Sequence, residues 1–154
     1  MKEEIVINNF YAKIGQNQVL LTAIIAWAIA QIVKTAVAAL KEKRINFRRL
    51  VETGGMPSSH STFVSSLATG IGVVEGWDTT MFALAAVFAL IVMYDAAGVR
   101  RAAGRQARVL NIIVADINKK DFKPERLKEL LGHTPVEVFI GALFGILFTL
   151  HRFM

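Results

Sequence analysis

The chain contains no cysteine among its 154 residues, which excludes disulfide bonds and metal sites built from thiolates. Acidic residues are also scarce, because 12 of them stand against 18 lysines and arginines, for a formal net charge of +6. The opening residues contain no apolar core followed by small residues, so we expect no cleaved signal peptide. No internal repeat or low-complexity segment is evident. A chain of this length is expected to form one domain, residues 1–154.

Apolar sequence, by contrast, is abundant and comes in long blocks. Hydrophobic residues make up 54% of the chain, and they concentrate in residues 19–40, 57–74, 80–94 and 136–150. A bilayer core needs roughly 20 helical residues, and fewer suffice where the ends are recessed. We therefore predict an all-α integral membrane helical bundle with about four transmembrane helices.

Positive charge is concentrated on one side of this predicted bundle. If the four helices cross alternately, residues 41–56 and 98–135 share a side, and together with Lys34 they hold 15 of the 18 basic residues. The positive-inside rule makes that side cytoplasmic, in a multi-pass protein of the cell membrane. A nucleic-acid partner is disfavoured, because the basic residues flank the spans and no basic groove studded with aromatic residues is visible.

Residues 100–117 form a different pattern, with apolar residues at helical spacing and Arg101, Arg105 and Arg108 among the polar ones. This pattern is typical of a basic amphipathic helix, which we expect to lie on the inner membrane surface.

Residues 54–61 read Gly-Gly-Met-Pro-Ser-Ser-His-Ser and stand directly before an apolar block. Proline suits a first helical turn, where free amides and the helix dipole attract anions. Ser58 and Ser59 add hydroxyl donors, and His60 adds an acid or base that works near neutral pH. A purely structural alternative is that Pro57 and the serines only cap a helix. We interpret the stretch as a seat for a phosphate.

A second imidazole precedes the last apolar block. His133 and Glu137 are four residues apart, so on a helix they share a face and the carboxylate can hold the imidazole in one tautomer. Under the alternating topology, His60 and His133 both fall at the cytoplasmic face. His151 lies at the opposite end of the same block.

Four further charged positions fall near that face, and each has two interpretations. Lys34 either extends to the headgroups or faces a polar pocket. Asp95 precedes Arg100 and Arg101 by five and six residues, which predicts a structural ion pair to Asp95 or phosphate contacts by the arginines. Phosphoryl transfer needs a nucleophile, a proton donor for the leaving oxygen and fixed positive charge, and these segments supply all three.

These residues resemble a known family. The run Pro57-Ser58-Ser59-His60 resembles the Pro-Ser-Gly-His signature of the type 2 phosphatidic acid phosphatase superfamily, which includes bacterial acid phosphatases and vanadium haloperoxidases. The run from His133 through Pro135 to Glu137 is similar to that superfamily's last motif, in which an aspartate follows the nucleophilic histidine by four residues. The whole chain is similar to the small divergent bacterial branch.

The resemblance implies a mechanism without metal or cofactor. His133 would attack phosphorus to give a phosphohistidine, and Glu137 would orient it. His60 would protonate the leaving alcohol and then activate water. The phosphate oxygens would be bound by backbone amides and by a set of polar side chains, namely Lys34, Ser58, Ser59, Arg100 and Arg101.

The chain departs from the family pattern at several positions. Glu137 replaces the aspartate and Ser59 replaces the glycine of the signature. Lys34 is not followed by the Arg-Pro of the first motif, and the Ser-Arg pair expected before the nucleophile is absent. Arg126 lies one place off that spacing, so Arg100 or Arg101 is the preferred replacement.

We therefore predict a metal-independent phosphatase acting on a lipid phosphate at the cytoplasmic leaflet. Candidate substrates are phosphatidic acid, phosphatidylglycerophosphate and a prenyl phosphate or diphosphate. The alternative is a protein that binds or transports an anionic lipid headgroup without turnover, and haloperoxidase chemistry is disfavoured because membrane burial suits lipids. Four short helices leave limited surface to enclose a polar pocket, which is compatible with a homodimer.

Overall fold

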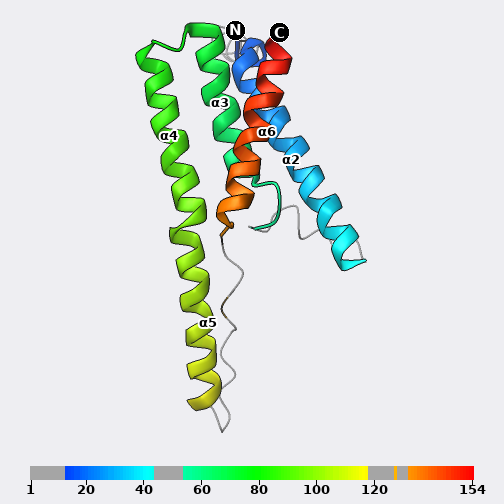
Figure 1. Ribbon diagram of the computed structural model, residues 1–154, viewed down its shortest axis with the longest axis vertical. Coiled ribbons are helices and arrows are strands. Elements are labelled where there is room, and N and C mark those ends of the chain that lie inside the picture. The colour runs from blue at the N-terminus through cyan, green and yellow to red at the C-terminus, as the bar shows by residue number, and fades with distance from the viewer. Residues whose placement is uncertain (1–12, 44–53, 118–126, 128–131) are drawn as a thin grey trace, which may run out of the picture.

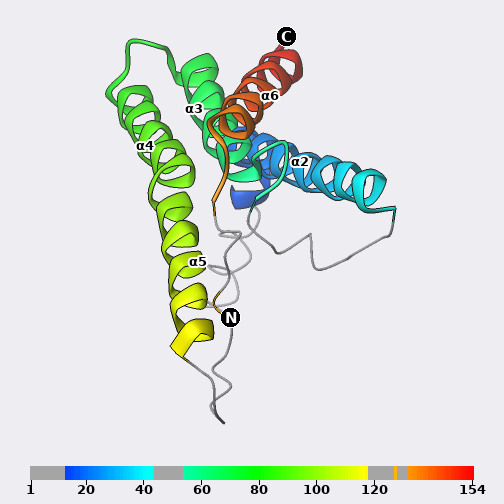
Figure 2. The ribbon, with the colours of Figure 1, turned by 60° about the horizontal axis from the view of Figure 1, so that its bottom comes forward.

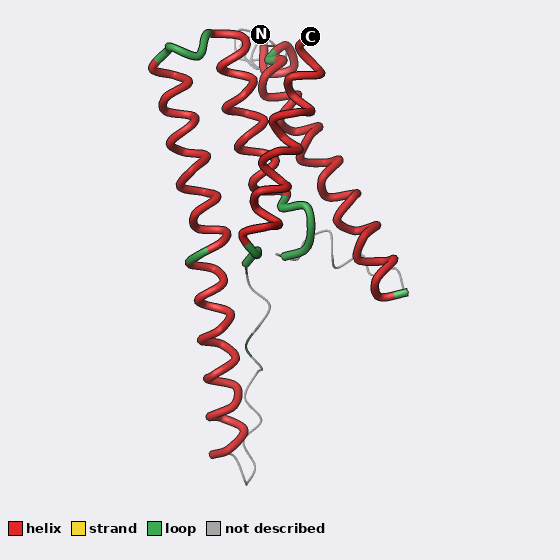
Figure 3. Tube along the Cα trace, in the orientation of Figure 1, coloured by secondary structure: helices red, strands yellow, loops and turns green. Residues whose placement is uncertain are grey.

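The computed structural model describes residues 13–43, 54–117, 127 and 132–154. Within these ranges the chain forms helices and no strand, so the predicted all-α class is confirmed (Figure 3). The helices are α2 (Gln18–Glu42), α3 (Ser59–Glu75), α4 (Thr80–Ala97), α5 (Val99–Ile117) and α6 (Pro135–Phe153) (Figure 1).

Helices α2, α3, α4 and α6 alternate in direction through the bundle (Figure 1). The first turns of α3 and α6 and the last turn of α4 therefore lie toward the same end, while the C-terminus lies at the other end. This is the arrangement that alternating spans require, and it brings together the segments that carry His60 and His133.

Polar residues set where four of these helices begin. The N-caps of α2, α3, α4 and α6 are Asn17, Ser58, Thr79 and Thr134, and each side-chain oxygen accepts a hydrogen bond from the backbone amide of the third residue of its helix. Such caps satisfy amides that have no partner within the helix. The first turn of each of these helices is therefore stabilised by residues that are neighbours in the sequence.

Helix α3 is the centre of the bundle, because it packs against α2, α4 and α6. Its contact with α6 is very close, since a Cβ atom added to Gly141 would overlap the backbone oxygen of Ser58. Small residues allow membrane helices to approach in this way. Hydroxyls join the two helices further along: Thr62 Oγ1 donates to the Gly141 carbonyl at 2.9 Å, and the Ser66 and Thr149 hydroxyls lie 2.6 Å apart.

Three helical stretches in the described ranges are long and apolar enough to cross a membrane, namely Gln18–Leu40, Thr80–Ala115 and Pro135–Phe153. Helix α3 has only 17 residues, and its buried face is largely serine, threonine and glycine. A helix covered by three neighbours does not need an apolar surface toward lipid. The integral membrane helical bundle is therefore confirmed, while the number of four spans stays a prediction.

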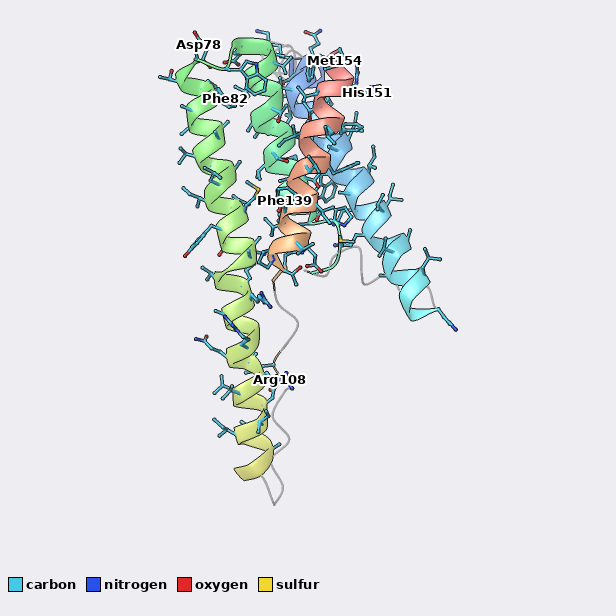
Figure 4. All side chains as sticks on the ribbon, in the orientation of Figure 1. Asp78, Phe82, Arg108, Phe139, His151 and Met154 are labelled. Carbon is cyan, nitrogen blue, oxygen red and sulfur yellow. The ribbon has the colours of Figure 1, made fainter. Side chains whose placement is uncertain are left out.

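Helix α5 differs from its expected orientation. It runs on from α4 in nearly the same direction instead of turning along a surface (Figures 1 and 2), and Arg108 lies beyond the end of the bundle (Figure 4). The reason is the joint at Gly98, whose backbone stays in the right-handed helical region. Its N–H donates to Tyr94 at 2.8 Å and its carbonyl accepts from Ala102 at 2.9 Å, so the helical hydrogen bonds continue through the joint.

Candidate active site

The segment that carries His60 reaches α3 through two glycines. Gly54 and Gly55 have φ angles of +98° and +91°, in the left-handed region that L side chains rarely adopt. A Cβ atom on Gly55 would also lie 3.2 Å from Cγ of Lys34, so this loop packs directly on the lysine. Ser58 then caps α3 and places His60, which is half-buried, in the first helical turn.

The backbone before α6 is held against the joint between α4 and α5. Gly132 has a φ of +90°, and a Cβ atom there would lie 2.5 Å from the backbone nitrogen of Arg101. The next residue, His133, donates its backbone N–H to the carbonyl of Ala96 at 2.9 Å. Its side chain is only 2% exposed. His133 is therefore fixed by helices distant from it in the sequence.

Glu137 orients the His133 ring. Its Oε2 lies 3.3 Å from Nδ1 of His133. An ionised carboxylate only accepts hydrogen bonds, so this contact favours the tautomer with the hydrogen on Nδ1 and the lone pair on Nε2. The carbonyl oxygen of Glu137 accepts from the Ser58 backbone N–H at 3.1 Å, which ties the start of α3 to the start of α6.

The two imidazoles lie side by side at this junction. The centroids of the His60 and His133 rings are 6.1 Å apart, and the ring planes are inclined by 65°. One ring comes from the first turn of α3 and the other from the residues just before α6. This separation allows one phosphoryl group to contact both rings.

Positive charge surrounds the ring pair. Lys34 is 5% exposed, and its charge acts on both imidazoles. Arg100 acts on His60, where Asp95 opposes it. Arg100 Nε also donates to Asp95 Oδ2 at 2.9 Å, in an ion pair whose side chains are 45% and 41% exposed. The ion pair is open to solvent, so it holds Arg100 near the site at little energetic cost.

Burial lowers the pKa of His133 below the ordinary value of 6.5. The Glu137 carboxylate and its hydrogen bond act in the opposite direction and raise that pKa. A smaller lowering of the pKa comes from Lys34, and a smaller rise comes from the backbone of Gly55. The net direction is downward, so His133 is neutral at pH 7.

A family model described as the divergent PAP2 family matches residues 15–148. The uncharacterized membrane protein YuiD of Bacillus subtilis (strain 168) is 46% identical over 143 residues, which is 85% of this chain and 90% of that protein. The chain belongs to the divergent PAP2 family. The matched range of this divergent PAP2 protein includes both histidines, Glu137 and the cations around them. No solved structure matches the chain.

The two serines of this divergent PAP2 protein that we predicted to bind phosphate differ in their surroundings. Ser58 is fully buried, and its hydroxyl oxygen accepts from the backbone N–H of Ser61 at 3.4 Å and from the Ser61 hydroxyl at 2.9 Å. Ser59 is 2% exposed and makes no side-chain hydrogen bond to any residue that the structure describes. The Ser59 hydroxyl is therefore the better candidate donor.

Arg101 contributes to the site mainly through its backbone. Its side chain is exposed, and no contact joins its guanidinium to either histidine within the described ranges. Those ranges also contain no group of three or more His, Asp or Glu residues placed to bind a metal ion.

Thr134 is a site residue that was not predicted from the sequence. Its Oγ1 accepts from the Glu137 backbone N–H at 3.3 Å, while Glu137 Oε2 accepts from the Thr134 backbone N–H at 3.0 Å. This reciprocal pair is a capping box, and threonine followed three residues later by glutamate is its sequence signal. The Ala96 carbonyl that holds His133 has no comparable signal, because any residue supplies a backbone oxygen.

Proposed function

We propose that this protein hydrolyses the phosphate ester of a membrane lipid at its cytoplasmic face, through a phosphohistidine on His133. The observation that supports this best is the ring pair, with the His133 and His60 ring centroids 6.1 Å apart and the Glu137 carboxylate beside Nδ1 of His133. Membership of the divergent PAP2 family supports a phosphatase-related role.

In the first step, the lone pair on His133 Nε2 attacks phosphorus while the bond from phosphorus to the lipid oxygen breaks. The leaving oxygen takes a proton from protonated His60, so a neutral alcohol departs. In the second step, neutral His60 takes a proton from water, and the resulting hydroxide attacks phosphorus. The bond from phosphorus to nitrogen breaks, inorganic phosphate leaves, and both imidazoles return to their starting states.

The residues around the rings stabilise the charge on the transferred phosphoryl group. Lys34 and Arg100 supply positive charge, and the first turn of α3 supplies backbone amides and the positive end of a helix dipole. The Ser59 hydroxyl adds a donor in the same turn. Glu137 stabilises the positive charge that His133 gains when it bonds to phosphorus.

A lipid substrate is favoured by the position of these residues at the ends of apolar helices. The rings lie at the start of α3 and before α6, whose remaining length is embedded in the bundle or faces the bilayer. The phosphate of a lipid lies at headgroup depth, where this site would open. Phosphatidic acid, phosphatidylglycerophosphate and prenyl phosphates all present a suitable group.

The direct test uses the purified protein with phosphatidic acid in mixed micelles containing EDTA. We expect release of inorganic phosphate that vanadate inhibits, and we expect His133→Ala to abolish it. His151→Ala is the matched control, because His151 lies near the C-terminal end of α6, far from Phe139 in the early turns of that helix (Figure 4). Full activity in His133→Ala would remove this histidine as the nucleophile.

A protein that binds the headgroup without turnover is the second candidate. The observation in its favour is that Asp95 neutralises part of the Arg100 charge, which weakens the phosphate clamp that catalysis needs. Rapid quenching with a phosphate-labelled lipid separates the two functions. An enzyme gives label on His133 that is stable to base and labile to acid, whereas a binder gives saturable affinity and no covalent label.

A further inference from the structure

One oxygen of Glu137 accepts two hydrogen bonds. Oε2 lies 3.0 Å from the Thr134 backbone nitrogen and 3.3 Å from Nδ1 of His133. The first bond belongs to the capping box of α6, and the second fixes the ring that faces His60. The geometry of the helix start and the geometry of the imidazole are therefore set by the same carboxylate.

The other half of the capping box fixes that carboxylate. Thr134 Oγ1 accepts the Glu137 backbone N–H at 3.3 Å, which anchors the first turn from which the Glu137 side chain extends. The Thr134 side chain is exposed and touches no other part of the site in the described ranges. Its contribution to the site therefore passes through Glu137.

The chemistry of a capping box explains why glutamate occupies position 137. The side chain at this position must curl back to the amide at the N-cap, which glutamate and glutamine can do. Aspartate is one methylene shorter, so we expect a single aspartate oxygen to serve that amide and the histidine less well than glutamate does.

We propose that Thr134 is a positioning residue, which acts through its capping box with Glu137 to hold the His133 ring in the orientation that phosphoryl transfer requires. The consequence of this inference for activity rests on the proposed function. The inference about ring orientation does not, because the tautomer of His133 can be measured in the absence of any substrate.

The experiment compares Thr134→Ala and Thr134→Ser with Thr79→Ala in lipid nanodiscs. Thr79 is the matched control, because it is the N-cap of α4 and accepts from the Phe82 amide at 3.2 Å, far from the rings. Both alanine variants lose a helix cap and should melt at lower temperature than the parent protein. Only Thr134→Ala should change His133.

Two readouts distinguish positioning from mere stability. Nitrogen-15 NMR should report hydrogen on Nδ1 of His133 in the parent protein, in Thr134→Ser and in Thr79→Ala, and a mixture of tautomers in Thr134→Ala. With phosphatidic acid as substrate, Thr134→Ala should lower kcat roughly ten- to hundredfold with little change in KM, because a ring turned out of line attacks poorly. Thr134→Ser should keep both the single His133 tautomer and the kcat of the parent protein.

Variants of Glu137 divide its two tasks. Glu137→Gln keeps an acceptor for the capping box but removes the charge beside His133, whose positive neighbours are His60 on α3 and Lys34 on α2. The acid limb of the pH profile should therefore move to lower pH with little loss of thermal stability. Glu137→Asp keeps the charge but breaks the box, so it should lower the melting temperature and mix the His133 tautomers.

The inference is overturned if Thr134→Ala melts lower but keeps a single Nδ1–H tautomer and an unchanged kcat. It is also overturned if Glu137→Asp matches the parent protein in tautomer and stability. A parent protein without phosphatase activity would contradict the proposed function alone, and the NMR comparison would still decide whether Thr134 positions His133.

Discussion

The helices α3 and α6 meet at the candidate site by their first turns, yet those turns satisfy their amides differently. In α6, the backbone N–H groups of Thr134 and Glu137 are both bonded within the capping box, and Pro135 has no N–H to satisfy. Of the first amides of α6, only that of Val136 lacks an acceptor in the described ranges, so the start of α6 is more nearly self-contained. These hydrogen bonds hold the backbone next to His133 in one conformation.

In α3, the cap is less complete. Of the first backbone amides of α3, the Ser58 hydroxyl accepts only that of Ser61, and no acceptor in the described ranges takes the amides of Ser59 or His60. Free amides at a helix start are donors for an anion, and the helix dipole adds to their effect. One helix start therefore holds His133 in place, while the other keeps amides available for an anion.

The strongest way to break this arrangement is to separate the two helix starts. Gly141→Ala adds one Cβ atom where the Ser58 backbone already lies, so we expect loss of folded protein and of all activity. The same change normally stabilises a helix by about 1 kcal/mol, which makes a destabilisation diagnostic of the contact. Gly15→Ala is the control, because nothing lies within 4 Å of a Cβ atom there. The measurement is thermal unfolding in detergent, and equal melting curves for the two variants would contradict the close contact.

The next effect concerns the proton supplied from α3. His60→Gln should lower kcat/KM, which reports formation of the phosphohistidine alone, by roughly 10²- to 10⁴-fold for a lipid substrate, because the alcohol must then leave without a proton donor. With p-nitrophenyl phosphate the loss should be far smaller, since that leaving group needs no proton. His133→Ala, just before α6, should abolish both reactions. If His60→Gln slowed the two substrates equally, His60 would not be the general acid.

A smaller effect is expected from Lys34, the cation against which Gly55 packs. Lys34→Gln removes a buried charge that acts on both rings, so vanadate should bind about tenfold or more weakly. The exposed Lys13 supplies the control variant Lys13→Gln, which should bind vanadate as the parent protein does. Competition between vanadate and substrate measures both. Unchanged vanadate affinity in Lys34→Gln would show that this charge serves the fold and not the anion.

Much of this site could be predicted from residue types and spacing. The histidines before two membrane helices, the carboxylate four residues after His133 and the alternating spans together place the rings at one end of the bundle. The ring separation and the His133 contact with Glu137 agree with that arrangement. The roles of nucleophile and acid remain predictions until activity is measured.

Other features of the site and fold could not be predicted from the sequence, because they depend on backbone contacts and on the backbone conformation of single residues between helices. The Ala96 carbonyl that anchors His133 and the packing of Gly55 on Lys34 leave no pattern of residue types. The direction of α5 depends on the backbone at Gly98 alone, and glycine permits a bend as readily as a straight continuation. Periodicity identifies an amphipathic helix but does not orient it.

The smallest predicted effect is a dependence of protein stability on pH that comes from the buried His133 ring. Burial lowers the pKa of His133 below 6.5, so the folded protein binds its proton less readily than the unfolded chain does. Stability should therefore fall as the pH drops from above 6.5 toward the lowered pKa, and each unit of pKa difference corresponds to about 1.4 kcal/mol. Melting temperatures between about pH 7.5 and about pH 5 should show this slope in the parent protein and a shallower slope in His133→Asn.

Because the neutral His133 ring persists below pH 6.5, phosphatase activity should also persist there. An acid limb that already falls at pH values above 6.5 would mean that Glu137, and not burial, dominates the pKa of the His133 ring.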